Sequence, residues 1–128
     1  MIWPSFFPSE CPPTEAENAS VEVFRIVSFD PPAACDFQSF AQTHPKKYQG
    51  KCKPSGLSVF TGMEDALKYL RRVQGEAQGV VPRRLIARAL LSPQAGKIQH
   101  TPSASHNSHH TWWAPDGFDH AATFKVVT

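Results

Sequence analysis

The sequence lacks the features of membrane-spanning, secreted and cysteine-stabilised small proteins. No apolar run approaches the roughly 18 residues that a helix needs to cross a bilayer. The apolar start, Met1 to Pro8, has no basic residue and is interrupted by prolines, unlike a signal peptide. The cysteines Cys11, Cys35 and Cys52 are widely spaced and form no C-x-x-C motif, which disfavours a disulfide framework or a cysteine-rich zinc site. We therefore expect reduced thiols, a cytoplasmic location and no membrane association.

Charged side chains are also scarce, and this composition argues against a disordered chain. They make up 19% of the 128 residues, and a chain of this length fits one hydrophobic core. Residues 1–20 read as an extended arm, and residues 21–128 as a single α+β domain. We expect the apolar start of the arm to lie over the core; the alternative is a contact surface for a protein partner.

Charge is distributed unevenly along the chain. Residues 1–45 carry a net charge of −5, residues 46–99 one of +8, and residues 100–128 one of −1. A segment as basic as 46–99 favours a polyanionic partner such as a nucleotide or RNA. The alternative is that the two halves attract each other within one domain.

Hydrophobic periodicity predicts more strands than helices. Six segments have strand patterns: 21–27, 56–61, 84–91, 96–101, 111–113 and 122–127. For 84–91 a short helix is the alternative. A short helix is expected from Asp36 to the His44-Pro45 stop, and a longer one after a capping box at Thr61–Glu64. Gly75 and Gly79 are expected to end the longer helix and to open a loop to Pro82. Because strands and helices do not alternate regularly, we predict an α+β fold, with a mixed or antiparallel sheet of about six strands and two short helices.

Histidine is concentrated near the C-terminus. Five of the six histidines are His100, His106, His109, His110 and His120. With two nearby aspartates they could ligate a metal, but their spacing matches no known ligand pattern. Neighbouring residues of a strand also point to opposite faces, so His109 and His110 do not easily serve one site. We expect no metal.

The same histidines suit acid–base chemistry or phosphate binding. An imidazole has a pKa near neutrality, and the polar stretch 103–108 is typical of a loop that presents functional side chains. His109 or His110 would act as acid or base, His100 would contact a ligand, and Trp112 or Trp113 could stack on a base. The alternative is that the tryptophans fill the core and the histidines are merely solvated.

Arg25 interrupts the apolar part of the first long strand. A half-buried arginine needs a partner, because burying an unpaired charge is costly. It either pairs with an acidic side chain such as Glu64 or Asp65, or it faces a cleft and binds an anion.

The order of these elements resembles the ADP-ribosyltransferase fold, which also serves RNA 2′-phosphotransferases. The resemblance covers residues 21–127 and depends on Phe24-Arg25, on 56–61 leading into a helix, and on 112–115. The stretches 56–61 and 108–113 also resemble a group of small uncharacterised bacterial proteins, which implies no function.

In the resembled fold, an arginine or histidine on the first strand and a serine or threonine on the second hold NAD or its phosphates. A late strand brings the catalytic residue. The resemblance thus implies ligand contacts for Arg25 and for Ser58 or Thr61, and a catalytic role for His109 or His110. No glutamate follows Glu76, so the catalytic acid of many ADP-ribosyltransferases is missing. The phosphotransferase branch relies on arginine and histidine instead.

Three classes of function follow. The first is a small nucleotide-handling enzyme that binds NAD or an RNA phosphate, which would suit a toxin or a defence effector. The second is a non-catalytic nucleic-acid-binding module that uses the basic segment 46–99. The third is a protein-interaction module, an adaptor or an immunity-type protein, that uses the apolar N-terminal arm.

Overall fold

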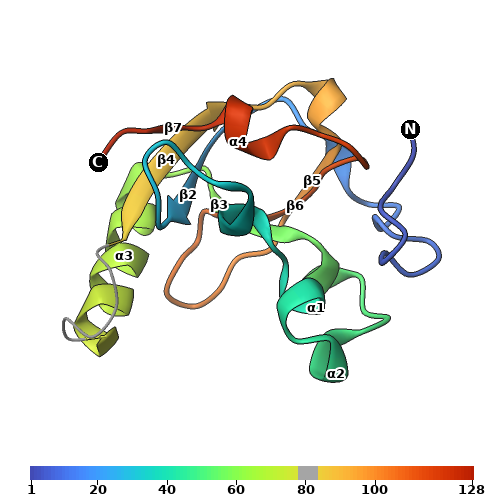
Figure 1. Cartoon of the computed structure of the whole chain (residues 1–128), viewed down its shortest axis with the longest axis horizontal. Helices are drawn as coiled ribbons and strands as arrows, with labels where there is room; N and C mark the ends of the chain where they lie inside the picture. Colours follow the sequence, from blue (N-terminus) through green and yellow to red (C-terminus); the bar gives the residue numbers. More distant parts are fainter. Residues whose placement is uncertain (78–83) are drawn as a thin grey trace.

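A computed structural model describes residues 1–77 and 84–128 of the chain, so the loop expected from Gly79 to Pro82 lies outside it (Figure 1). The described residues form one seven-stranded sheet in which every neighbouring pair of strands is antiparallel. The strands are β1 (Glu17–Asn18), β2 (Glu22–Val27), β3 (Leu57–Phe60), β4 (Leu85–Leu90), β5 (Lys97–His100), β6 (His109–Trp113) and β7 (Lys125–Val126). Their spatial order is β1-β5-β6-β3-β2-β4-β7. The predicted α+β class with an antiparallel sheet is confirmed.

The strand predictions differ from the structure at the two ends of the chain. The arm adds β1, which pairs with β5 at one edge of the sheet. The segment 122–127 was predicted as one strand, but α4 (His120–Thr123) occupies its start and only β7 is extended. The Asp119 carboxylate caps α4 by accepting the amide of Ala122, and this local bond outweighs the strand propensity of the following residues.

Four helices are present in the described residues: α1 (Phe40–Thr43), α2 (Pro45–Tyr48), α3 (Met63–Ala77) and α4. As predicted, the first ends before Pro45. It is capped by Ser39 rather than by Asp36, whose carboxylate accepts the amides of Ser28 and Ala33. Because α3 begins at Met63, Gly62 rather than Thr61 precedes the first helical residue, and the amide of Thr61 donates to the carbonyl of Ser108 instead of to a capping-box glutamate. The expected end at Gly75 is wrong, because α3 continues to Ala77. Three short 3₁₀ segments complete the backbone: η1 (Ala34–Phe37), η2 (Lys53–Ser55) and η3 (Pro93–Ala95).

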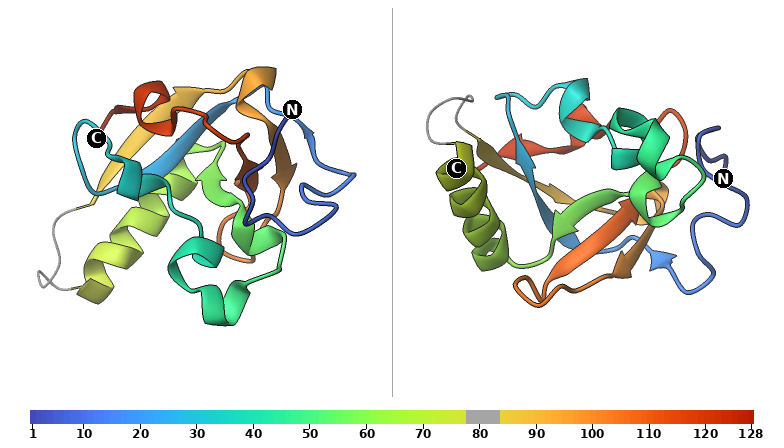
Figure 2. Two further views of the ribbon diagram at one scale, coloured as in Figure 1. Left: turned by 45° about the vertical axis from the view of Figure 1, so that its right-hand side comes forward. Right: turned by 90° about the horizontal axis from the view of Figure 1, so that it is seen from below.

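Both faces of the sheet are covered. One face packs Val23, Val59 and Trp112 against Phe37 and Phe124, which come from η1 and the segment after α4. The other face packs Phe24, Phe60 and Ile86 against the apolar side of α3. In Figures 1 and 2, α3 and the N-terminal arm lie at opposite ends of the sheet.

The sheet is weakly joined in its middle. Six residue pairs connect β2 with β4, and four connect β3 with β6. In contrast, only Phe24 and Phe60 pair across β2 and β3. The two halves of the sheet therefore separate beyond this pair, on the side of Arg25 and Ser58.

The N-terminal arm lies over the core, which is the first of the two interpretations of its sequence. Trp3 and Phe7 pack against a buried cluster that contains Cys11 and Trp113. The expectation of reduced thiols is wrong, because Cys11 and Cys52 form a disulfide, while Cys35 is free and exposed. The two cysteines are 41 residues apart in the sequence, so no local pattern indicated that they would pair. In the part of the chain that the structure describes, no helix is both long and apolar enough to cross a membrane.

Candidate functional site

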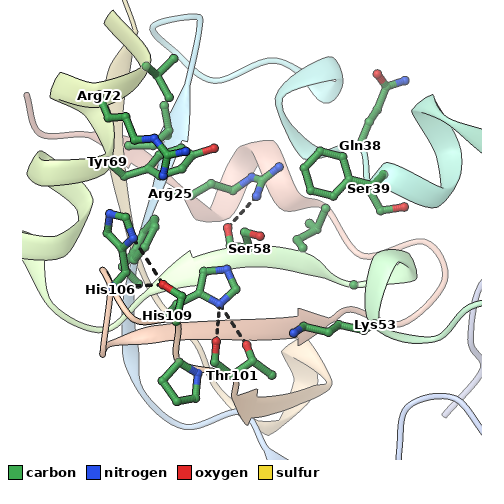
Figure 3. Close-up of a pocket in the computed structure, with 18 of the residues that line it drawn as sticks. Arg25, Gln38, Ser39, Lys53, Ser58, Tyr69, Arg72, Thr101, His106 and His109 are labelled. Carbon is green, nitrogen blue, oxygen red and sulfur yellow. Dashed lines mark hydrogen bonds between the residues drawn. The ribbon is translucent and has the colours of Figure 1, made fainter. Parts of the chain in front are cut away.

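A cavity of about 550 Å³ lies where β2 and β3 separate. Its walls come from β2, β3 and the start of β6, from α3, from the β5–β6 loop, and from segments 38–40 and 53–57 (Figure 3). This volume falls within the roughly 300–1,000 Å³ of ordinary small-molecule and cofactor sites.

The cavity is lined by positive charge. Arg25, Lys53, Arg72 and Arg84 reach its wall, and no aspartate or glutamate does so among residues 1–77 and 84–128. Two histidines, His106 and His109, also line it. Because carboxylates are missing, the field inside favours an anion, and several separate cations suit a ligand with more than one phosphate.

Arg25 bridges the gap between the separated strands. Its Nε donates to the carbonyl of Asp36 at 3.0 Å, and Nη1 donates to the carbonyl of Ser58 at 2.7 Å. The guanidinium also lies 5.7 Å from the ring of Phe37. Neither Glu64 nor Asp65 is its partner, so the ion pair considered from sequence is not formed. Among the described residues no acceptor meets Nη2, which leaves its N–H groups for a ligand.

Loss of hydration lowers the pKa of Arg25 to about 10, while the charge of Asp36 partly opposes this effect. Arg25 is therefore still protonated at neutral pH. A charged group that is held by two neutral carbonyl oxygens keeps most of its attraction for an anion.

His109, at the start of β6, faces Arg25 across Ser58. Its Nδ1 lies 2.8 Å from the carbonyl oxygen of Thr101, which can only accept, so Nδ1 carries the proton in the neutral ring. Figure 3 shows the other ring nitrogen pointing away from Thr101 towards the cavity. Desolvation lowers the pKa of His109 below its ordinary value, and the charge of Lys53 adds to this effect. At pH 7 the ring is neutral and presents the lone pair of Nε2, which is the state of a general base.

Two buried nitrogen atoms without a protein partner belong to residues that line the cavity. They are Nε of Arg84 and Nε2 of His106, and no other buried side-chain nitrogen or oxygen in the described residues is unsatisfied. A buried polar group without a partner costs about 1–3 kcal/mol. Both atoms are closed off from solvent, so neither is placed to contact a ligand in this structure.

Aromatic side chains form part of the wall. Tyr69 and Phe60 pack around His106, with ring centroids 5.7 Å apart in each pair. Phe40 also lines the cavity, and 55% of its surface is exposed. Phe40 therefore offers the exposed aromatic ring that was expected from Trp112 or Trp113.

The loop between β5 and β6 is fixed to α3. The carboxylate of Asp65 accepts the backbone amide and the hydroxyl of Ser108, at 2.8 and 2.7 Å. Lys68 donates to the carbonyl of Ser105 at 2.6 Å. These contacts hold the segment that carries His106 and leads into His109. The two Ser108 hydrogen bonds also lower the pKa of Asp65.

The structure brings together three of the eight site residues predicted from sequence and places the other five elsewhere. Arg25, Ser58 and His109 line one cavity from three adjacent strands (Figure 3). Thr61 does not line it; its amide donates to the carbonyl of Ser108. The rings of His100 and His110 pack together with their centroids 4.8 Å apart, and neither residue lines the cavity.

The two tryptophans are core residues. Trp112 is fully buried and Trp113 is 1% exposed, so neither offers a face to a ligand from solvent. Their indole N–H groups donate to the carbonyls of Ala95 and Cys52. The stacking role expected for them is not available in this structure. The alternating pattern of a half-buried strand does not apply at Trp112-Trp113, because α4 and the N-terminal arm cover the two faces there.

Other cavity residues carried no usable signal in the sequence. Arg84 was predicted only as the start of a strand. Lys53 and Arg72 belonged to the basic segment 46–99 without a role of their own. Only the separation of β2 from β3 brings these cations to one space, and no local pattern encodes it.

Within the described residues, no three side chains of histidine, cysteine, aspartate or glutamate gather closely enough to hold a metal ion. No protein-family model, curated protein or solved structure matches the chain. The site is therefore interpreted from its own geometry.

Proposed function

We propose that the chain is a small nucleotide-handling enzyme whose cavity binds the phosphates of NAD or of an RNA end. The observation that carries the proposal is the convergence of Arg25 and His109 on a cavity that no described carboxylate lines. In this proposal the chain keeps the ADP-ribosyltransferase-like or phosphotransferase-like character that its element order implies, and a role as a toxin or defence effector would follow.

Each side chain of the cavity has a role in this proposal that follows from its position. Arg25, Arg72 and Arg84 neutralise phosphate oxygens, and His109 accepts the proton of an attacking hydroxyl through Nε2. Ser58 lies between them on β3. A bound NAD would supply a ribosyl carbon with a departing nicotinamide. The missing glutamate is consistent with chemistry in which arginine and histidine replace a carboxylate.

A thermal-shift screen with NAD and with short 5′-phosphorylated RNA tests this proposal. A ligand at 100 times its dissociation constant stabilises the folded protein by about 2.7 kcal/mol, so its melting temperature should rise clearly. His109→Asn keeps an N–H near the position of Nδ1 but removes Nε2, and Arg25→Lys keeps the charge but not the planar fork. Both should reduce the shift, whereas His110→Asn, outside the cavity, should not. No shift with any ligand, and no difference between Arg25→Lys and the wild type, would defeat the proposal.

Two non-catalytic readings remain as alternatives. A nucleic-acid-binding module would use the cations of segment 46–99, and its affinity would fall steeply with salt without any turnover. A protein-interaction module would use the tip of the arm, where Met1 and Ile2 are 69% and 77% exposed. Deletion of residues 1–2 would then abolish binding of a partner without affecting nucleotide binding.

A cytoplasmic location also remains a proposal. The Cys11–Cys52 disulfide counts against it, because such bonds persist mainly in oxidising compartments.

A further inference from the structure

Beside the mouth of the cavity, three aromatic side chains of α1 and α2 form a cluster. Ring centroids are 6.2 Å apart for Phe40 and His44, 5.9 Å for Phe40 and Tyr48, and 6.5 Å for His44 and Tyr48. Phe40 also lines the cavity, so the cluster and the cavity are continuous. Figure 1 shows α1 and α2 projecting from the body of the sheet.

Basic side chains surround this cluster. Lys46, Lys47, Lys51 and Lys53 are all exposed, and Lys47 lies 5.2 Å from the centroid of the Tyr48 ring. Lys53 again belongs to the cavity wall. No acidic residue occurs between Asp36 and Glu64, so nothing within this segment neutralises the four lysines. We call the seven side chains, Phe40, His44, Tyr48 and the four lysines, the aromatic–basic ledge.

Exposed aromatic faces next to cations suit a single-stranded polynucleotide. Bases of any sequence stack on aromatic rings, while lysines track the phosphates. A duplex hides its base faces in the stack, and an acidic protein offers no succession of flat rings. The exposed ring of Phe40 is therefore the feature that favours single-stranded nucleic acid over other polyanions.

We infer that the ledge binds single-stranded nucleic acid and guides one end of the strand into the cavity. This inference deepens the proposed function and depends on it, because it identifies the substrate as a polynucleotide that extends beyond the cavity. The nucleotide within the cavity meets Arg25 and His109, and the next nucleotides stack on Phe40 and lie along the lysines. RNA and DNA share the required chemistry.

Fluorescence anisotropy with labelled ten-nucleotide RNA and DNA strands tests the ledge. Phe40→Leu keeps an apolar side chain but removes the ring, and we expect roughly tenfold weaker binding. Its control is Phe29→Leu, which alters another exposed phenylalanine (52% exposed) outside the cavity. Lys46→Ala/Lys47→Ala should weaken binding and reduce the slope of log affinity against log salt by about 1.4, the value for two lost phosphate contacts. Arg71→Ala/Lys125→Ala removes two exposed charges elsewhere and should leave the slope unchanged.

The outcomes separate this inference from the proposed function. Tighter binding of RNA than of DNA, or the reverse, identifies the natural strand and supports the inference in either case, provided that Phe40→Leu weakens binding. Equal loss in the ledge variants and their controls overturns it, as does binding of duplex or heparin that Phe40→Leu leaves unaffected. In those cases NAD can still stabilise the protein through Arg25 and His109, and the proposed function stands. If the strand binds the ledge but Arg25→Lys and His109→Asn alter neither strand binding nor any nucleotide binding, the proposed function fails together with the guiding role inferred here.

Discussion

Arg25 has both a structural and an electrostatic role in this structure. Its hydrogen bond to the carbonyl of Ser58 joins β2 to β3 where backbone pairing is missing, and its bond to the carbonyl of Asp36 joins β2 to η1. The same guanidinium lines the cavity. The charge that would bind a phosphate thus also holds the two halves of the sheet together. The proposed ligand site and the weakly paired part of the sheet therefore coincide at one residue.

Arg25→Ala should therefore destabilise the protein by about 2 kcal/mol, because two carbonyl oxygens lose charged donors. Urea denaturation monitored by tryptophan fluorescence measures this difference. Arg88→Ala is the matched control: its contact with Glu22 is 3.4 Å long, both side chains are about half exposed, and its loss should cost less than about 1 kcal/mol. Equal effects of the two substitutions would show that Arg25 does not join the strands.

The burial of His109 predicts a pH dependence of stability. Its pKa in the folded protein lies below the 6.5 of an ordinary histidine, mainly through desolvation, so the unfolded chain binds its proton more tightly. The contribution of His109 to the free energy of unfolding is fully present above pH 6.5, the ordinary pKa of the unfolded chain. It is lost as the pH falls through the lower pKa of the folded protein. The pKa values of His110 and His120 are also lowered by desolvation, and they act in the same direction.

Wild-type protein should consequently be less stable at pH 5.5 than at pH 7.5, and His109→Asn should lose less than the wild type over this interval. Denaturation at both pH values measures the two differences. If the variant and the wild type lose the same stability, the neutral, buried state assigned to His109 is wrong.

Among the elements, β3 depends on a close approach that only glycine permits. A Cβ on Gly56, just before β3, would lie 2.5 Å from the Thr111 methyl carbon and 3.0 Å from the Trp113 ring. Because Trp113 is held by its bond to Cys52, it has little freedom to move away. This packing places the start of β3 at the cavity wall.

Gly56→Ala should destabilise the protein by about 1–3 kcal/mol, the usual cost of overpacking. Gly75→Ala is the opposite case, because Gly75 lies in α3 with nothing within 4 Å of an added Cβ, and alanine there should stabilise by about 0.5–1 kcal/mol. Thermal denaturation of both variants distinguishes them. A neutral Gly56→Ala would mean that β3 does not pack as closely as described.

Sequence patterns predicted the elements better than their contacts. Alternation and helical spacing located β2 to β5 and α3; in β4 and β5, for example, buried positions are interspersed with more exposed ones. They also predicted a strand at 111–113, but not that both Trp112 and Trp113 would be buried. The same patterns predicted that His109 and His110 would point to opposite faces, but they could not tell which of the two would enter a cavity.

At the scale of the whole molecule, the site depends on contacts between distant segments. The resemblance of element order implied Arg25, Ser58 or Thr61, and His109 or His110, and of these Arg25, Ser58 and His109 line the cavity. Arg72, Arg84 and Phe40 reach the cavity only through tertiary packing. The pairing of Cys11 with Cys52 has the same origin. Such contacts depend on how the sheet twists and separates, which composition and periodicity do not encode.

The disulfide ties the N-terminal arm to the segment that leads to Lys53 and β3. A cross-link over 41 residues stabilises by up to about 4 kcal/mol through the unfolded chain. Cys11→Ser/Cys52→Ser should lower the midpoint of urea denaturation correspondingly, while Cys35→Ser, at an exposed free thiol, should not. Mass spectrometry of the alkylated, unreduced protein should find one modified cysteine. Three modified cysteines would contradict the pairing.

The central claim, a shared cavity that joins Arg25 and His109 around a phosphate-bearing ligand, is tested most directly by NMR. Spectra of ¹³C-labelled histidine rings would be recorded during titration with NAD and with a 5′-phosphorylated RNA dinucleotide. We predict saturable shifts of the His109 and His106 rings with at least one of the two ligands, while His100 and His110 remain in place. Unchanged His109 resonances at saturating concentrations of both ligands, or equal shifts of all the histidines, would contradict it.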